Sequence, residues 1–148
     1  MTYSSTRFLV FFTIFLVSLQ CGCGALFKRK LVYVQMTNRV PGQVNLTIHC
    51  KSGDEDLGSH VLAPEGHWGF QFRPNFWKTT LYFCSFQWPG NFHYFDIYKK
   101  AKSRPGCHDC FWNVGPDGPC LFDYDTKGYG YCEPWNPPVP SLTGKPVL

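Results

Sequence analysis

The stretch Val44-Asn45-Leu46-Thr47-Ile48-His49-Cys50 decides the fold class of this chain. Its apolar residues alternate with Asn45, Thr47 and His49, and this period of two is typical of a β-strand with one buried face. Asn45-Leu46-Thr47 is also the single N-glycosylation sequon of the chain, so Asn45 is a candidate glycosylation site. A glycan has to point to solvent. The alternation and the sequon therefore both place Asn45 on the outer face of the expected strand.

The sequence on either side extends this pattern to an all-β fold. Residues 79–88 are almost continuously apolar, with Cys84 on the more apolar side, which predicts a central strand. Further strands are expected at residues 31–38, 68–72, 92–98, 111–114 and 120–124. We therefore expect an antiparallel β-sandwich, immunoglobulin-like in layout, of about eight short strands. Residues 51–59 are expected to form a loop, and residues 40–43 a hairpin turn between two strands.

Residues 1–25 have the pattern of a secretory signal peptide. Arg7 supplies the positive flank, an apolar stretch follows at residues 8–19, and small residues favour cleavage after Ala25. That stretch is too short to span a membrane and no second one follows, so we expect a secreted, extracellular protein without a membrane anchor. One domain would cover residues 26–132. The proline-rich tail, residues 133–148, would be extended or disordered, with Trp135 exposed.

The charge balance gives no sign of a nucleic-acid partner. The chain carries a net charge of +4 at pH 7. Arg7 is the one charged residue of the leader, so the mature chain would keep a mild positive excess. The sequence contains no basic run of the kind that nucleic-acid binding requires. We therefore expect no nucleic acid among the partners.

Six cysteines follow the leader, and an even number in a secreted chain predicts a disulfide-stapled domain. Cys50 and Cys84 both point inward, and each could pair with the other or with Cys107 or Cys110. If Asn113 faces Cys120 across a turn, Cys110 lies about 10 Å from the position opposite Cys120, which disfavours that pair. Residues 107–110 also have zinc-ligand or redox-motif spacing, but secretion favours disulfides. The candidates are Cys50, Cys84, Cys107, Cys110, Cys120 and Cys132.

No motif indicates an enzyme, a metal or a cofactor. The histidines have no accompanying serine or cysteine elbow, and Gly-x-Ser-x-Gly is absent. Three adjacent acids, Asp54, Glu55 and Asp56, lack the spacing of an EF-hand, so a solvated turn is favoured over a calcium site. The tryptophans of the strand patterns are expected mostly in the core rather than as sugar-stacking platforms. They are Trp68, Trp77, Trp88 and Trp112.

Binding residues are expected on loops, because loops on a rigid scaffold carry a disproportionate share of function. The densest positive segment contains Lys99, Lys100, Lys102 and Arg104. A solvated basic loop would have the same composition. Our hypothesis is that this segment, together with Asp54, Glu55 and Asp56, forms part of a receptor-facing surface.

Several motifs, taken in order, resemble those of one family. They are Leu46-Thr47-Ile48-His49-Cys50-Lys51-Ser52, Asp54-Glu55-Asp56-Leu57-Gly58, Phe70-Gln71-Phe72, Asn75-Phe76-Trp77, Thr80-Leu81-Tyr82-Phe83-Cys84, Phe95-Asp96-Ile97-Tyr98 and Cys110-Phe111-Trp112-Asn113-Val114, with Cys107 and Asp117-Gly118. Together they resemble the plant self-incompatibility S-protein family and its homologues. Cys132 and the proline-rich tail lie outside the matched motifs.

The resemblance implies a small secreted plant β-sandwich that acts as a ligand in cell–cell signalling and recognition. Such a ligand would bind an unidentified cell-surface receptor protein, in pollen rejection or in a related developmental role. It would need no catalytic step and no cofactor. The alternative is a secreted defence protein or a protein that binds cell-wall carbohydrate.

Overall fold

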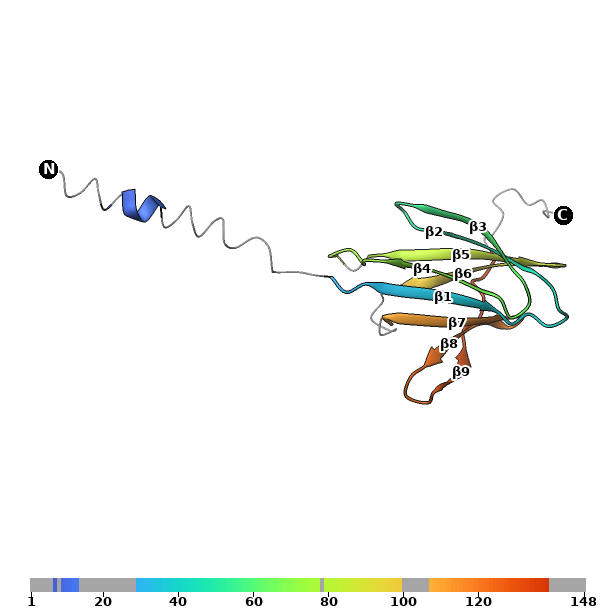
Figure 1. Cartoon of the computed structure of the whole chain (residues 1–148). Helices are drawn as coiled ribbons and strands as arrows, with labels where there is room; N and C mark the ends of the chain where they lie inside the picture. Colours follow the sequence, from blue (N-terminus) through green and yellow to red (C-terminus); the bar gives the residue numbers. More distant parts are fainter. Residues whose placement is uncertain (1–6, 8, 14–28, 78, 100–106, 139–148) are drawn as a thin grey trace.

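Within the residues that the structure describes, nine β-strands form two stacked sheets (Figure 1). The structure is a computed structural model and describes residues 7, 9–13, 29–77, 79–99 and 107–138. The sheets have the strand orders β4-β1-β7-β8-β9 and β3-β2-β5-β6, which confirms the all-β sandwich with one strand more than expected. The strands are β1 (Val32–Asn38), β2 (Leu46–Lys51), β3 (Asp56–Leu62), β4 (His67–Phe72), β5 (Leu81–Trp88), β6 (Asn91–Lys99), β7 (Asp109–Gly115), β8 (Gly118–Asp123) and β9 (Gly128–Cys132).

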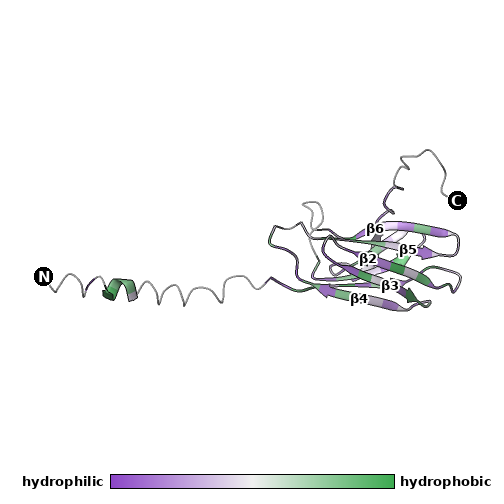
Figure 2. Cartoon of the chain, turned by 90° about the horizontal axis from the view of Figure 1, so that it is seen from above, coloured by the Kyte–Doolittle hydropathy of each residue, from purple (hydrophilic) through white to green (hydrophobic). Residues whose placement is uncertain are grey.

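The core lies between the inner faces of the two sheets. In β1, β2 and β5, buried residues alternate with more exposed ones, as the sequence pattern predicts. Figure 2 shows both hydrophilic and hydrophobic stretches along the labelled strands of the sandwich. Phe86 of β5 and Trp112 of β7 are among the largest fully buried side chains. A slip of one residue would turn every buried side chain of a strand to solvent, so this pattern fixes the register.

The connection between β1 and β2 is not the hairpin that we expected. β1 pairs with β4 and with β7, the latter in parallel, whereas β2 pairs with β3 and β5. The prediction for residues 40–43 is therefore wrong, because the chain crosses here from one sheet to the other. Buried Asn38 fixes the crossing. Its side-chain amide donates hydrogen bonds to the carbonyls of Val44, Leu62 and Ala63 at 2.9, 3.1 and 3.2 Å.

Strand β3 begins inside the segment that was predicted to be a loop. Three of the residues at 56–59, Asp56, Gly58 and Ser59, are polar or glycine, and such residues have low strand propensity. The prediction is wrong for them because β3 is an edge strand that pairs with β2, where Lys51 faces Asp56 and His49 faces Ser59. Polar side chains on an edge strand also hinder pairing with other chains. Tertiary pairing thus outweighs local propensity at this position.

The six cysteines form three disulfides in the described residues. Cys50–Cys84 joins facing residues of β2 and β5, and Cys120–Cys132 joins facing residues of β8 and β9. The third, Cys107–Cys110, closes a short segment at the start of β7. Asn113 does face Cys120, which confirms the predicted register of β7 and β8. Because every one of these sulfur atoms is bonded to another, none remains as a thiolate ligand for zinc.

The first described residues of the tail pack against the sandwich. The amide of Glu133 donates to the carbonyl of Pro119 in β8 at 2.9 Å, and the amide of Asn136 donates to that of Tyr94 in β6 at 3.0 Å. Residues 133–136 therefore connect the two sheets on one side of the core. The ring of Trp135 is half-buried, and it contacts Phe86 and His93 with centroid distances of 5.2 and 4.7 Å. The expectation that Trp135 is exposed is wrong.

Several sequence predictions fall partly or wholly on residues that the structure does not describe. Arg7 and residues 9–13 of the leader are helical. In the described part of the chain, no helix is long and apolar enough to cross a bilayer. The expected cleavage site after Ala25, the basic residues Lys100, Lys102 and Arg104, and residues 139–148 lie outside the described residues.

Candidate functional site at one end of the sandwich

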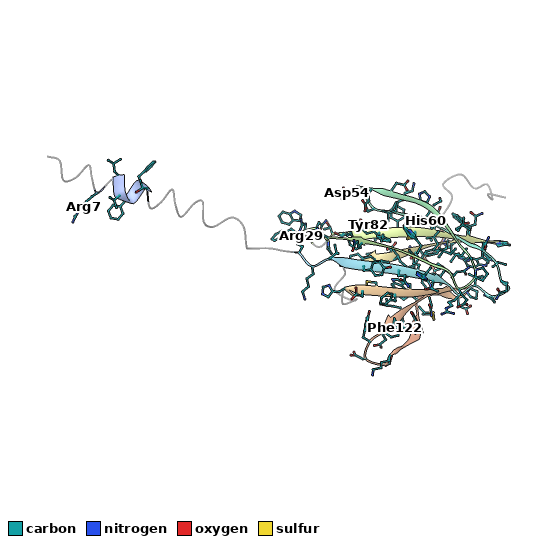
Figure 3. All side chains as sticks on the ribbon, viewed as in Figure 1. Arg7, Arg29, Asp54, His60, Tyr82 and Phe122 are labelled. Carbon is teal, nitrogen blue, oxygen red and sulfur yellow. A yellow bond between two sulfur atoms is a disulfide. The ribbon has the colours of Figure 1, made fainter. Side chains whose placement is uncertain are left out.

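One end of the sandwich has a hollow of about 770 Å³. It is lined by Arg29 before β1, by the connection from β2 to β3, and by the connection from β4 to β5. Figure 3 labels Arg29, Asp54 and Tyr82, which lie toward this end. Residues of both charge signs, Arg29 and Arg73 as well as Asp54 and Glu55, line the same hollow. A surface with this mixture favours a partner with a complementary charge pattern.

The acidic connection between β2 and β3 is held in a fixed turn by Ser52. The Ser52 hydroxyl accepts hydrogen bonds from the amides of Asp54 and Glu55 at 3.2 and 3.1 Å. The amide of Ser52 donates in turn to the carbonyl of Glu55 at 2.8 Å. Serine favours such turns because its side chain can replace a backbone acceptor. The exposed Asp54 side chain is therefore presented from an ordered loop.

The three adjacent acids occupy three different environments. Asp54 is exposed at the hollow, whereas Glu55 accepts a hydrogen bond from the hydroxyl of Tyr82 at 2.5 Å. Asp56 lies at the start of β3 and contacts His49 at 2.6 Å and Lys51 at 3.1 Å. A hydrogen bond from the amide of Gly58, followed by those from His49 and Lys51, holds the pKa of Asp56 well below its usual range. Glu55 and Asp56 thus have different partners within the protein, whereas the side chain of Asp54 is presented to solvent at the hollow.

Tyr82 gives this end of the sandwich a measurable alkaline signature. Burial and the hydrogen bond to Glu55 raise the pKa of Tyr82 to about 12, against about 10 for a tyrosine in an unfolded chain. A raised pKa in the folded state contributes stability below about pH 10, and this contribution is lost as the pH rises from about 10 to about 12. We predict that Tyr82→Phe removes this part of the alkaline decline, as measured by the unfolding free energy across that range.

Glu55→Gln provides the matched variant for this test. It keeps a hydrogen-bond acceptor but removes the charge, so Tyr82 should lose its proton at lower pH than in the wild type. Phenolate absorbance reports this step directly. Identical alkaline profiles for the wild type and Tyr82→Phe would contradict the assignment.

The connection from β4 to β5 presents two aromatic side chains to solvent. The side chain of Asn75 donates to the Thr79 hydroxyl at 2.7 Å and accepts from the Thr79 amide at 2.9 Å. The amide of Asn75 donates to the Thr80 hydroxyl at 2.7 Å. These bonds close the loop that carries Phe76 and Trp77, whose rings meet edge to face at 5.5 Å. Trp77 is 80% exposed, so the expected core position is wrong for this tryptophan.

The sequence does contain a signal for the exposed position of Trp77. Asn75 and the threonines four and five residues later can form side-chain-to-backbone hydrogen bonds of the kind that favours a turn over a strand. A turn after Pro74 interrupts the alternation that would place Trp77 inward. Trp88 and Trp112 are buried and Trp68 is half-buried, so the prediction of core packing is confirmed for most of the group.

The structure brings the start of the predicted basic segment close to the acidic loop. Lys99 ends β6 and faces Leu81 of β5, and Leu81 lines the hollow with Asp54. Lys99 also forms an ion pair with Asp96, at 3.6 Å. The hypothesis that basic and acidic loops share a surface is therefore compatible with the position of Lys99. It stays a prediction, since the other basic residues lie outside the described part of the chain.

Three histidines, His49, His60 and His93, have side-chain partners within the described residues. His49 binds Asp56, His60 stacks on Trp68 at 3.8 Å, and the ring of His93 is parallel to that of Trp135. Burial lowers the pKa of His93. Within the described residues, no group of three or more histidine, cysteine or acidic side chains is placed to hold a metal ion.

Comparison with known proteins identifies the family of this chain. A family model described as plant self-incompatibility protein S1 matches residues 33–135, which include β1 to β9 apart from the first residue of β1, together with Trp135. The chain belongs to the plant self-incompatibility protein S1 family. The match covers the hollow apart from Arg29, and it extends into the segment that closes the side of the sandwich.

Relatives of this S1-family chain are found among proteins of Arabidopsis thaliana. It is 48% identical to S-protein homolog 5 over 102 residues, which are 69% of this chain and 76% of that protein. It is 41% identical to S-protein homolog 3 over 107 residues, 70% of this chain and 71% of that protein. With S-protein homolog 20 the identity is 40% over 129 residues, 86% of this chain and 89% of that protein.

A solved structure supports the fold of the S1-family chain. It is described as that of self-incompatibility protein homologues, a widespread family of small, highly stable, secreted proteins from plants. The two structures agree with a TM-score of 0.53 at 19% sequence identity, over 74% of this chain and 98% of the other. At this identity the agreement is one of fold, and it confirms the arrangement of strands that positions the loops.

Proposed function

We propose that this protein is a secreted ligand in plant cell–cell recognition, which binds a cell-surface receptor protein through the loop end of the sandwich. It would act in pollen rejection or in a related developmental role and would catalyse no reaction. The observation that carries the proposal is the exposed Trp77, held on a hydrogen-bonded loop beside a hollow of mixed charge. Membership of the S1 family and the leader sequence support secretion and a role outside the cell.

The physics of protein interfaces favours this end of the molecule. A few buried aromatic or arginine side chains carry most of the binding energy at an interface, and surrounding charges contribute specificity. Trp77 and Phe76 offer a large apolar surface, and the hydrogen bonds of the neighbouring Asn75 reduce the conformational freedom that is lost on binding. Arg29, Arg73 and Asp54 surround the hollow next to them. Signalling then follows if the ligand prefers one state of its receptor and shifts the receptor toward it.

Trp77→Ala tests the proposal. We expect it to weaken saturable binding of the labelled, full-length secreted protein to pollen grains or plant protoplasts at least tenfold, or about 1.4 kcal/mol. The matched control is Tyr131→Ala, which removes another strongly exposed aromatic ring from β9 at a different part of the surface. This control should bind as the wild type does.

Two results would contradict the proposal. One is equal binding by the wild type and Trp77→Ala. The other is binding that disappears after digestion of cell-wall polysaccharide and survives protease treatment of the cell surface, since this would assign the protein to carbohydrate rather than to a receptor protein.

A further inference from the structure

The outer face of the four-stranded sheet carries a second hollow, which shares one lining residue, Phe83, with the hollow at the loop end. Its volume is about 500 Å³. Figure 2 labels β6, β5, β2 and β3 side by side in the order of this sheet. The lining residues are outward-facing side chains that stand in rows across the strands: Thr47, Gln87 and Phe92; Ser59, His49, Ser85 and Tyr94; and Lys51 with Phe83.

Three aromatic side chains that line this hollow are exposed to solvent. Phe92 is 52% exposed and Tyr94 is 42% exposed, and their rings meet edge to face at 5.0 Å. Phe83 of β5 is also exposed on the same face. Aromatic side chains bury large areas and dominate the energy of interfaces. A cluster of exposed aromatic rings marks a candidate interaction site.

The polar residues around these rings are suited to a neutral ligand. Lys51 forms an ion pair with the carboxylate of Asp56, so its charge is compensated within the protein, and the ring of His49 contacts the same carboxylate. The other polar lining residues are uncharged hydroxyls and an amide, from Thr47, Ser59, Ser85 and Gln87. Hydroxyls and amides both donate and accept hydrogen bonds. Aromatic faces combined with such groups match the apolar face and the hydroxyl rim of a sugar ring.

The sequon lies at the edge of this hollow. Asn45 is exposed and precedes β2, in which Leu46 is buried and Thr47 faces outward, so the alternation of side chains puts Asn45 on the outer face. Thr47 faces Gln87, and Gln87 faces Phe92. With about 4.8 Å between strands and about 3.4 Å per residue, Asn45 lies about 12 Å from Phe92. The first few rings of an N-linked glycan span this distance.

We propose that a glycan attached to Asn45 lies over this hollow and packs on the rings of Phe92 and Tyr94. The glycan covers the outer face of the four-stranded sheet, and it leaves the loop end of the sandwich open. The inference is independent of the proposed receptor function, because it concerns a covalently attached group and two rings, Phe92 and Tyr94, that do not line the hollow at the loop end.

Attachment to the same chain explains why a shallow hollow is sufficient. A tethered group has an effective concentration on the order of millimolar, so weak contacts with two aromatic rings hold it in place. For a free sugar, the same contacts would have to offset the whole loss of translational and rotational freedom on binding. The position of Asn45 therefore favours the chain's own glycan over a sugar from outside.

The test measures how accessible the glycan is on the folded protein. The full chain is secreted from eukaryotic cells that add oligomannose glycans, and it is then treated under native conditions with an endoglycosidase that cuts within the glycan core. We expect the double variant F92S/Y94S to lose its glycan about tenfold faster than the wild type, because the rings that hold the glycan against the protein are absent. A tenfold ratio of release rates corresponds to about 1.4 kcal/mol of stacking. Tyr131→Ser is the matched control and should lose its glycan at the wild-type rate.

A second measurement guards against a folding artefact. After denaturation all three proteins should lose the glycan at one common rate, and the thermal stabilisation that the glycan gives relative to Asn45→Gln should shrink in the F92S/Y94S background. Equal native release rates would overturn the proposal, as would an unmodified Asn45 in the intact mass of the secreted chain. Unchanged release rates together with a dimer of Asn45→Gln in sedimentation would assign the hollow to a second copy of the chain instead.

Discussion

Replacement of both Cys50 and Cys84 by alanine is expected to lower the free energy of unfolding by about 4 kcal/mol, more than the loss of either other disulfide. The bond joins residues separated by 34 positions, whereas Cys120–Cys132 and Cys107–Cys110 have separations of 12 and 3. In the chain-entropy model the stabilisation grows with the length of the closed loop, which gives about 3 and about 2 kcal/mol for the shorter ones. Cys50 and Cys84 are also fully buried, so alanine adds a loss of packing.

Urea unfolding of the three paired variants under non-reducing conditions measures this ranking. Each variant removes both cysteines of one bond, so that no free thiol remains to form a wrong pair. The C107A/C110A variant is the matched control, because it also removes two cysteines but the disulfide that it lacks closes a far shorter loop. If that variant lost as much stability as C50A/C84A, loop closure would not be the source of the stabilisation.

The parts of the fold that follow from local alternation could be predicted from the sequence. In β2 and β5 a side-chain period of two identifies the buried face without knowledge of the partner strand. The inward positions of Cys50 and Cys84 follow from the same pattern. The register of β7 and β8 was also predictable, because a short turn fixes which residues face each other.

The parts that depend on distant contacts could not be predicted in this way. The parallel pairing of β1 with β7 joins segments far apart in the sequence, and no local pattern encodes it. The crossing at Asn38 depends on carbonyls of Leu62 and Ala63, which belong to another part of the chain. β9 contains two glycines and becomes a strand through its pairing with β8 and the disulfide to Cys120.

In the candidate site, too, some residues could be predicted from local sequence and others depend on distant contacts. The acidic loop was identified from its polarity, and the structure places Asp54 at the hollow. Phe83, Phe92 and Tyr94 were not recognised as surface residues, because both faces of β5 and β6 carry aromatic side chains. Alternation tells which residues share a face, but it does not tell which of two apolar faces is covered by the other sheet. Here the answer depends on how the sheets stack.

Trp135→Ala is expected to cost about 3 kcal/mol of unfolding free energy, near the lower end of the range for truncation of a packed aromatic side chain, since this ring is half-buried. Its ring contacts Phe86, Trp88, His93 and Phe95, and its indole nitrogen donates to the carbonyl of Pro116 at 2.9 Å. The variant Trp135→Phe keeps the ring contacts and loses this hydrogen bond, so it should cost about 1 kcal/mol. Urea unfolding of the two variants separates packing from hydrogen bonding.

A substitution at Gly118 tests the packing of Trp135 in a second way. A methyl group at this position would clash with the carbonyl oxygen of Glu133, and the φ of Gly118, +132°, is one that other residues rarely adopt. Gly118→Ala should therefore displace the segment that carries Trp135. Because both substitutions would release one segment, their costs in the double variant should be much less than additive. Fully additive costs would mean that residues 133–136 do not close the sandwich as a unit, and that Trp135 fills a local gap instead.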